Sequence, residues 1–183
     1  MSDLIINEHK SASYAPRTYH NASVADLTLA VAIDFNTAGE KLTHKAAGEK
    51  YLPIWYYTTS LLASREIYST CKRLNVKTLN IAGNGIYTFF DQGIDQVEIN
   101  QKLYEILSLV HKHWPIEHIV SGGQTGVDTA GAVVACTLGI PCTLTLPKGL
   151  KMRFADGLDV SVPEEQIRAD INGFVKRLLG DNV

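Results

Sequence analysis

Short apolar runs alternate with longer segments of helical periodicity along most of this chain, and this alternation limits its possible folds more than any other feature. The apolar runs, each of a length typical of a buried strand, are Leu27–Phe35, Val76–Ala82, Ile116–Ser121 and Cys142–Leu146. The predicted helices are Tyr57–Leu74, Gln96–Trp114, Val127–Leu138, and a last helix that the capping-box pattern Ser161-x-x-Glu164 opens and that runs to about Leu179. The pattern predicts an α/β fold, Rossmann-like and doubly wound, with a mainly parallel sheet and helices on both faces.

The length of 183 residues suits one domain. We expect residues 24–183 to form this single domain and residues 1–23, which are polar and show no clear periodicity, to form an N-terminal arm. Residues 36–53 carry glycine and proline breaks with many charges, and they are predicted to be a loop.

The charge balance argues against a protein that binds duplex nucleic acid. Seventeen Lys and Arg residues face nineteen Asp and Glu residues, which gives a formal charge of −2. The three cysteines are an odd number and include no C-x-x-C pair, so we expect a reducing, cytoplasmic location. Apolar runs stay far below the ~20 residues of a membrane helix, and we expect no membrane partner.

The strongest local motif is Ser121-Gly-Gly-Gln-Thr-Gly-Val-Asp128, which lies between a predicted strand and a predicted helix. Glycines let a backbone approach a ligand closely, and the free N–H groups at a helix start bind anions. The alternative is a tight turn whose glycines only let the helix pack closely. The candidate ligand-binding residues of this loop are Ser121, Gly122, Gly123, Gln124, Thr125, Gly126 and Asp128.

Two well-known nucleotide motifs are not matched. A Walker A loop has Lys-Ser or Lys-Thr directly after its last glycine, but Val127-Asp128 follow Gly126 here. A dinucleotide fingerprint begins at Gly83-Asn84-Gly85, but Thr88 stands where its third glycine belongs. The sequence therefore supports neither an ATPase motor nor an ordinary NAD dehydrogenase.

Three other segments follow predicted strands and are expected at the same edge of the sheet, where doubly wound folds bind ligands. Asp34 lies at the end of the strand at 27–35, Gly83, Asn84 and Gly85 form a second glycine turn, and Lys148 with Gly149 follows the strand at 142–146. We expect the loop at 122–126 to cradle phosphate, Lys148 to neutralise it, and Asp128 with Asn84 to contact sugar or base. The candidates for catalysis are Asp128 and Asp34. The alternatives are plain turns, a solvated lysine and a carboxylate that only complements a helix dipole.

No metal is expected, because the six histidines form no ligand set, and the cofactor stays open. His111 and His113 are two residues apart on a predicted helix and therefore face different directions.

The stretch IVSGGQTGVDTAGAVVACTLGIPCTLTLPKG, with Ala155-Asp156-Gly157 shortly after it, resembles the molybdenum-carrier family of the SLOG superfamily of Rossmann-like nucleotide-binding domains. The similarity covers about residues 116–157. It implies a pocket for a nucleotide or a nucleotide-derived ligand, and by position it points to the loop residues above and to Lys148. Dimers are common in that superfamily, so a homo-oligomer is expected by analogy.

The SLOG superfamily also includes phosphoribohydrolases, whose motif is P-G-G-x-G-T-x-x-E. This chain departs from it, because Ser121 replaces the proline, the third glycine comes one position later and no glutamate follows at that spacing. The leading expectation is a binding protein or sensor for a nucleotide-like, phosphate-bearing small molecule. The alternatives are a nucleotide N-glycosidase and a carrier of molybdate or molybdenum cofactor.

Overall fold

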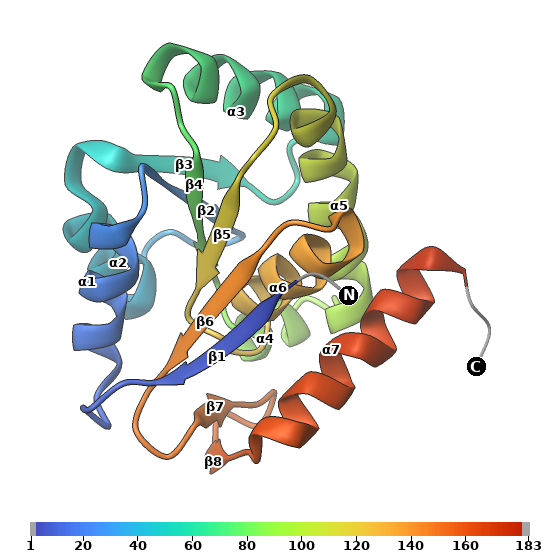
Figure 1. Cartoon of the computed structure of the whole chain (residues 1–183). Helices are drawn as coiled ribbons and strands as arrows, with labels where there is room; N and C mark the ends of the chain where they lie inside the picture. Colours follow the sequence, from blue (N-terminus) through green and yellow to red (C-terminus); the bar gives the residue numbers. More distant parts are fainter. Residues whose placement is uncertain (1–2, 181–183) are drawn as a thin grey trace.

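The structure, a computed structural model, describes residues 3–180, and its centre is a parallel six-stranded sheet (Figure 1). The strand order is β1-β6-β5-β4-β2-β3, and every neighbouring pair is parallel. The strands are β1 (Leu4–Glu8), β2 (Leu27–Ala32), β3 (Tyr51–Trp55), β4 (Thr78–Gly83), β5 (His118–Ser121) and β6 (Cys142–Leu146). The predicted α/β, Rossmann-like fold is confirmed.

Helices cover both faces of this sheet. Helices α1 (Tyr14–Val24) and α2 (Ala38–Ala47) pack against each other on one face. On the other face α3 (Ser60–Leu74), α5 (Gln96–His113), α6 (Val127–Leu138) and α7 (Glu164–Leu179) follow one another. The smaller elements are a 3-10 turn η1 (Gly48–Lys50), the short helix α4 (Ile86–Phe90) and an antiparallel hairpin of β7 (Lys151–Arg153) and β8 (Asp159–Ser161).

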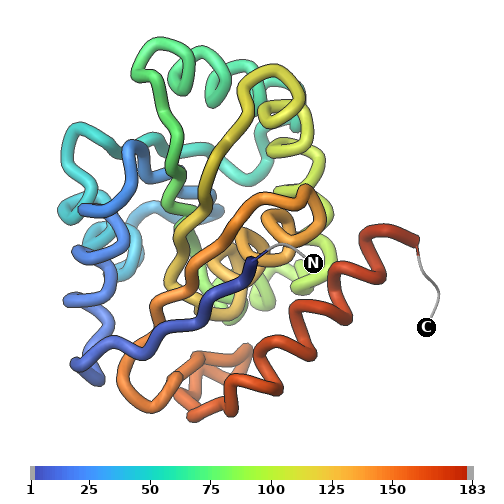
Figure 2. Tube along the Cα trace, in the orientation of Figure 1, coloured from blue at the N-terminus to red at the C-terminus, as the bar shows by residue number. Residues whose placement is uncertain are grey.

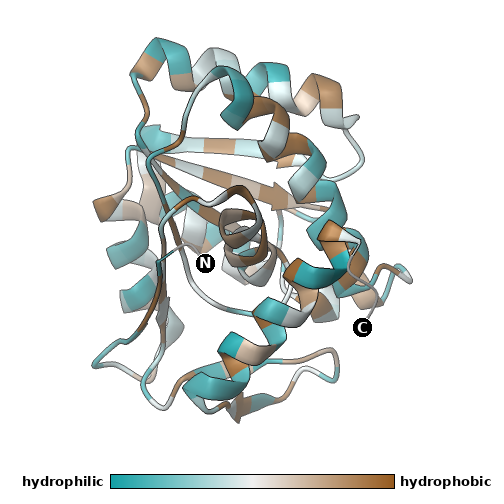
Figure 3. Cartoon of the chain, turned by 45° about the vertical axis from the view of Figure 1, so that its right-hand side comes forward, coloured by the Kyte–Doolittle hydropathy of each residue, from teal (hydrophilic) through white to brown (hydrophobic). Residues whose placement is uncertain are grey.

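The core lies between the sheet and its helices. All six residues of β2 are buried, as expected for a strand that is covered on both faces. Helix α6 consists mainly of small residues and lies close to the sheet, so that a Cβ at Gly131 would stand 2.8 Å from the Cβ of Ile81. Helix α7 contributes buried Ile167 and Ile171 and shows mixed polar and apolar colours in Figure 3, as an amphipathic surface helix should.

The expectation of an N-terminal arm at residues 1–23 is wrong for the residues that the structure describes. Strand β1 pairs with β6 in the register Leu4 with Cys142, and Figure 2 shows the blue N-terminal segment beside the orange one. Helix α1 follows it and packs on the sheet. In β1 only Leu4 and Ile6 are half-buried, and its apolar run, Leu4–Ile6, is three residues long, which is too short to predict a strand.

The prediction of a loop at residues 36–53 is also wrong, because these residues form α2, η1 and the start of β3. Thr37 caps α2 with its hydroxyl, which accepts a hydrogen bond from the Glu40 N–H. Pro53 lies in β3, which is an edge strand, where a missing N–H is tolerated. Helix α3 begins at Ser60 after the Thr59 cap, three residues later than predicted.

The capping box expected at Ser161 and Glu164 does not form. Ser161 ends β8, and the N-cap of α7 is Pro163, which offers no side-chain cap. A real capping box opens α5 instead, where Asp95 and Glu98 each accept the other's backbone N–H. Among the described residues, no helix is both long and apolar enough to cross a membrane.

Candidate functional site

The chain reverses its winding direction at β2, and a pocket lies there. From β2 the chain passes through α2 to β3 on one side, and α3 then carries it to β4 on the other side of β2. Such a switch point leaves a crevice beyond the carboxyl ends of the strands. The pocket there has a volume of about 320 Å³ and is lined by α1, the first half of α2, β4 with the turn after it, the glycine loop with Asp128, and Arg153.

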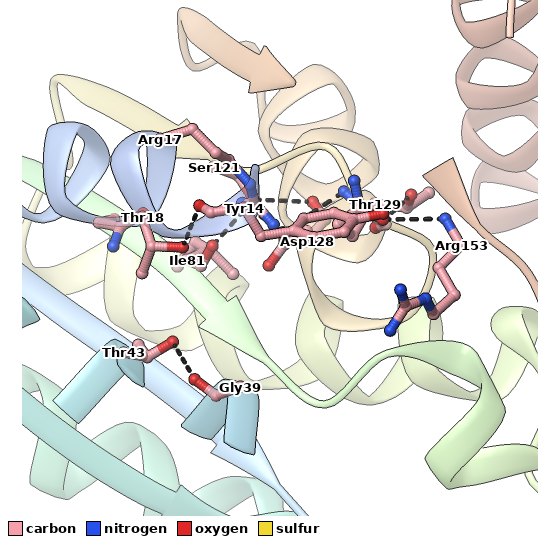
Figure 4. A network of polar contacts seen from close by, with 12 residues as sticks. Tyr14, Arg17, Thr18, Gly39, Thr43, Ile81, Ser121, Asp128, Thr129 and Arg153 are labelled. Atoms are coloured by element: carbon pink, nitrogen blue, oxygen red, sulfur yellow. Dashed lines mark hydrogen bonds and ion pairs between the residues drawn. The ribbon is translucent and has the colours of Figure 1, made fainter. Parts of the chain in front are cut away.

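An ion pair between Arg17 and Asp128 lies in this pocket (Figure 4). Nη1 of Arg17 is 3.2 Å from Oδ2 of Asp128, and the two residues are 9% and 6% exposed. The backbone N–H of Gln124 donates to the same oxygen over 3.3 Å. Burial raises the pKa of Asp128, while Arg17 and the Gln124 N–H act in the opposite direction. A carboxylate of the chain itself thus lies against the glycine loop.

Gly122 makes this arrangement possible. A Cβ at position 122 would lie 1.3 Å from Nη1 of Arg17 and 2.3 Å from Oδ2 of Asp128, so the ion pair fills the space of the absent side chain. Gly126 has a different role, because the turn into α6 requires glycine there for two reasons. Its φ is +95°, and a Cβ at this position would lie 2.5 Å from the carbonyl oxygen of Asn84.

The backbone N–H groups of the loop fall into two groups. The Gly126 N–H donates to Oε1 of Gln96 over 2.6 Å, and the Val127 N–H donates to the Asn84 carbonyl over 3.2 Å. Within the described part of the chain, the N–H groups of Gly122, Gly123 and Thr125 make no hydrogen bond. Gly122 and Thr125 line the pocket and Gly123 does not, so the loop offers two unpaired backbone donors there.

Three polar side chains of the motif serve the fold. The Ser121 hydroxyl is fully buried and donates to the Ile81 carbonyl over 2.8 Å. The Gln124 amide donates to the Lys151 carbonyl over 2.7 Å and accepts the Arg153 N–H over 2.9 Å. The Thr125 hydroxyl donates to the Arg153 carbonyl. Gln124 and Thr125 thus fasten the hairpin to the glycine loop.

The second glycine turn lines the pocket with Gly83 and Gly85, but Asn84 does not. Oδ1 of Asn84 accepts the N–H groups of Ile33 and Asp34 over 2.9 and 3.0 Å, and its Nδ2 donates to the Asp34 carbonyl. Asn84 therefore fixes the end of β2. The Asp34 side chain is exposed, accepts the Asn36 N–H, and does not line the pocket.

Lys148 and Gly149 lie outside the pocket, on the exposed turn after β6. The cations that line the pocket are Arg17 and Arg153. Arg153 makes two hydrogen bonds to Asp159, of 2.8 and 3.1 Å, and the Tyr14 hydroxyl donates to the same carboxylate over 2.7 Å. Burial and the Asp159 contact raise the pKa of Tyr14 to about 12. This cluster joins the hairpin to α1 at the side of the pocket.

The residues that sequence reasoning missed lie mainly on α1. Tyr14, Arg17 and Asn21 line the pocket, and their spacing of three and then four residues places them on one side of a helix. That spacing was the available signal. Arg17 Nε and Asn21 Nδ2 are buried donors without a partner among the described residues.

A second buried carboxyl lies close to the pocket wall. Glu40 is 2% exposed, and its contact is a long hydrogen bond of 3.4 Å from the Tyr51 hydroxyl. Burial and, after it, the charge of Asp128 raise the pKa of Glu40 to about 7.

Among the described residues, no group of three or more His, Cys, Asp or Glu side chains could hold a metal ion. Comparison with protein-family models, with curated proteins and with solved structures gives no match for this chain.

Proposed function

We propose that this protein binds a nucleotide or a nucleotide-derived phosphate ligand in the switch-point pocket, as a sensor or binding protein. The observation that carries the proposal is the meeting of unpaired donors in one crevice: the N–H groups of Gly122 and Thr125, and the buried donors of Arg17 and Asn21. Such donors match the acceptor-rich surface of a nucleotide.

The pocket volume favours a small ligand. About 320 Å³ is at the lower end of the range of ligand pockets, which begins at roughly 300 Å³. This volume suits one mononucleotide better than a dinucleotide.

The charges of the pocket orient the ligand. Asp128 would repel a phosphate placed beside Arg17, and Glu40 adds a further carboxyl nearby. Arg153 lies beside Thr125 in the pocket lining. Its Nε and Nη2 donate to Asp159, and its Nη1 has no hydrogen-bond partner among the described residues. We therefore assign the phosphate to the side of Arg153 and Thr125, and the sugar or base to the side of Asp128.

The test is the thermal midpoint of the purified protein with each of the common nucleoside monophosphates, with orthophosphate and with molybdate. A rise in Tm with nucleotides above that with orthophosphate supports the proposal. A response to molybdate alone would replace it with the oxyanion-carrier alternative, and no response to any nucleotide would contradict it.

An N-glycosidase is the second candidate, and the buried carboxyls favour it. Asp128 lies in the pocket with a raised pKa, and such groups stabilise positive charge on a ribose or activate water. Water would then replace the base at the sugar carbon, giving free base and ribose phosphate. Release of free base on incubation with a nucleotide, lost in Asp128→Asn, supports the enzyme, whereas stabilisation without turnover supports the binding protein.

A further inference from the structure

We infer that the inner end of the pocket binds the edge of a nucleobase on which an N–H group stands next to a carbonyl, as in guanine, hypoxanthine or uracil. This inference rests on the proposed function and adds the class of base to it.

The donors of this inner end come from α1. Arg17 Nε and Asn21 Nδ2 have no hydrogen-bond partner among the described residues, although Arg17 is 9% exposed and Asn21 is 3% exposed. Both residues line the pocket, and they lie one helical turn apart on the same side of α1. Buried donors are normally paired, so two unpaired ones beside a cavity indicate an acceptor on the ligand.

The acceptors come from α6 and β4. Both hydrogen bonds of the Asp128 carboxylate go to Oδ2, which leaves Oδ1 without a partner among the described residues. Asn80 is 3% exposed and uses Nδ2 to donate to the Thr28 hydroxyl over 3.1 Å, so its Oδ1 is likewise unpaired within residues 3–180. Asp128 and Asn80 also line the pocket.

Fixed donors beside fixed acceptors favour a rigid group that carries both functions. A carbonyl next to an N–H provides this pattern, because the carbonyl accepts from Arg17 or Asn21 while the N–H donates to Asp128. Adenine has the reversed pattern, with an amino group in place of the carbonyl and a bare ring nitrogen in place of the N–H. It would place donor against donor and acceptor against acceptor.

A ribose is the competing occupant of the same space. Its hydroxyls rotate, and each can either donate or accept, so a ribose would fit without distinguishing between bases. The two occupants therefore predict different ligand preferences.

The test measures Kd by calorimetry for guanosine, inosine, uridine and adenosine monophosphates and for ribose 5-phosphate. We expect the guanosine and inosine nucleotides to bind at least about tenfold more tightly than the adenosine nucleotide. Equal affinity for all bases and for ribose 5-phosphate would overturn this inference and leave the proposed function intact. No binding of any nucleotide would overturn both.

Two variants of Asn21 test whether α1 is responsible for the preference among bases. Asn21→Ala removes one donor, and Asn21→Ser is a milder change if Asn21→Ala lowers the Tm of the ligand-free protein. Either variant is expected to reduce the preference for guanosine over adenosine monophosphate at least threefold, and the exposed control Asn7→Ala on β1 is expected to keep it. An unchanged preference in both Asn21 variants would overturn the role of α1.

Discussion

The guanidinium of Arg17 occupies the space that a side chain at residue 122 would fill, 3.2 Å from the carboxylate of Asp128. Arg17 lies on α1 and Asp128 on α6, so the pair joins helices on opposite faces of the sheet. The ion pair is buried, and removal of one partner of such a pair leaves the other charge without compensation.

Gly122→Ala should therefore destabilise the protein by about 3 kcal/mol, because the new methyl group displaces Arg17 from Asp128. The backbone at residue 122 does not have a positive φ, so backbone strain adds nothing. Urea denaturation measures the change in the free energy of unfolding. The control Gly173→Ala, in α7 with no neighbour near its Cβ, should gain about 0.5–1 kcal/mol. Equal stability of Gly122→Ala and wild type would contradict the close packing of Arg17.

The pH dependence of stability should carry the signature of Glu40. The pKa of Glu40 is about 7 in the folded protein, whereas its ordinary value is 4.5. Between these two pH values the folded protein therefore keeps a proton on Glu40 that the unfolded chain has lost. Stability should then fall as the pH rises from about 4.5 to 7, by up to about 3 kcal/mol from this group. Glu40→Gln should flatten the profile in urea denaturation between pH 5 and 8. A variant that follows the wild-type slope would show that Glu40 titrates normally.

Arg153 and Lys148, which both follow β6, should differ in their effect on ligand binding. Arg153 lines the pocket, whereas Lys148 is exposed outside it. Arg153→Ala is expected to weaken nucleotide binding at least about tenfold, the cost of one charge-assisted contact, and Lys148→Ala to leave Kd unchanged. Calorimetry with the tightest-binding nucleotide measures the Kd of each variant. A larger loss in Lys148→Ala would restore the phosphate role that the sequence predicted for Lys148.

The anchoring of the hairpin by Gln124 can be tested by hydrogen exchange. Gln124→Ala removes the acceptor of the Arg153 N–H and the donor to the Lys151 carbonyl. Exchange of the Arg153 amide should accelerate at least about fivefold, since one lost hydrogen bond corresponds to about 1 kcal/mol or more. Gln101→Ala, which removes only a surface contact to Glu105, is the control. Unchanged exchange would mean that the hairpin is held by Tyr14 and Asp159 instead.

The sequence was sufficient to predict those helices and strands whose pattern is local. Helix α6 and strand β6 have the predicted bounds, because glycine or proline limits each on both sides. The motif at 121–128 was placed correctly between a strand and a helix. Strand β1 and helix α2 escaped prediction, since an edge strand and a short helix rich in polar residues have weak periodicity.

The site was less predictable than the fold, because its contacts join distant parts of the chain. Asn84 was expected to contact a ligand, but its side chain binds the backbone just after β2, whereas Gln124 lines the pocket and also binds the backbone of β7. Helical spacing places Arg17 on one side of a helix with Tyr14 and Asn21, but it gives no sign of the ion pair with Asp128, which lies 111 residues away. A polar residue can be placed on an edge of the sheet from sequence, but its hydrogen bonds depend on tertiary structure.

The pairing of β1 with β6 has a consequence for synthesis on the ribosome. Helix α1, which carries Arg17 and Asn21, lies between β1 and β2, and β1 has β6 as its neighbour in the sheet. Strand β1 must therefore wait until residues 142–146 leave the exit tunnel before it can pair with β6. A nucleotide added to stalled nascent chains would find a complete pocket only after this late step, so that binding would report the end of folding.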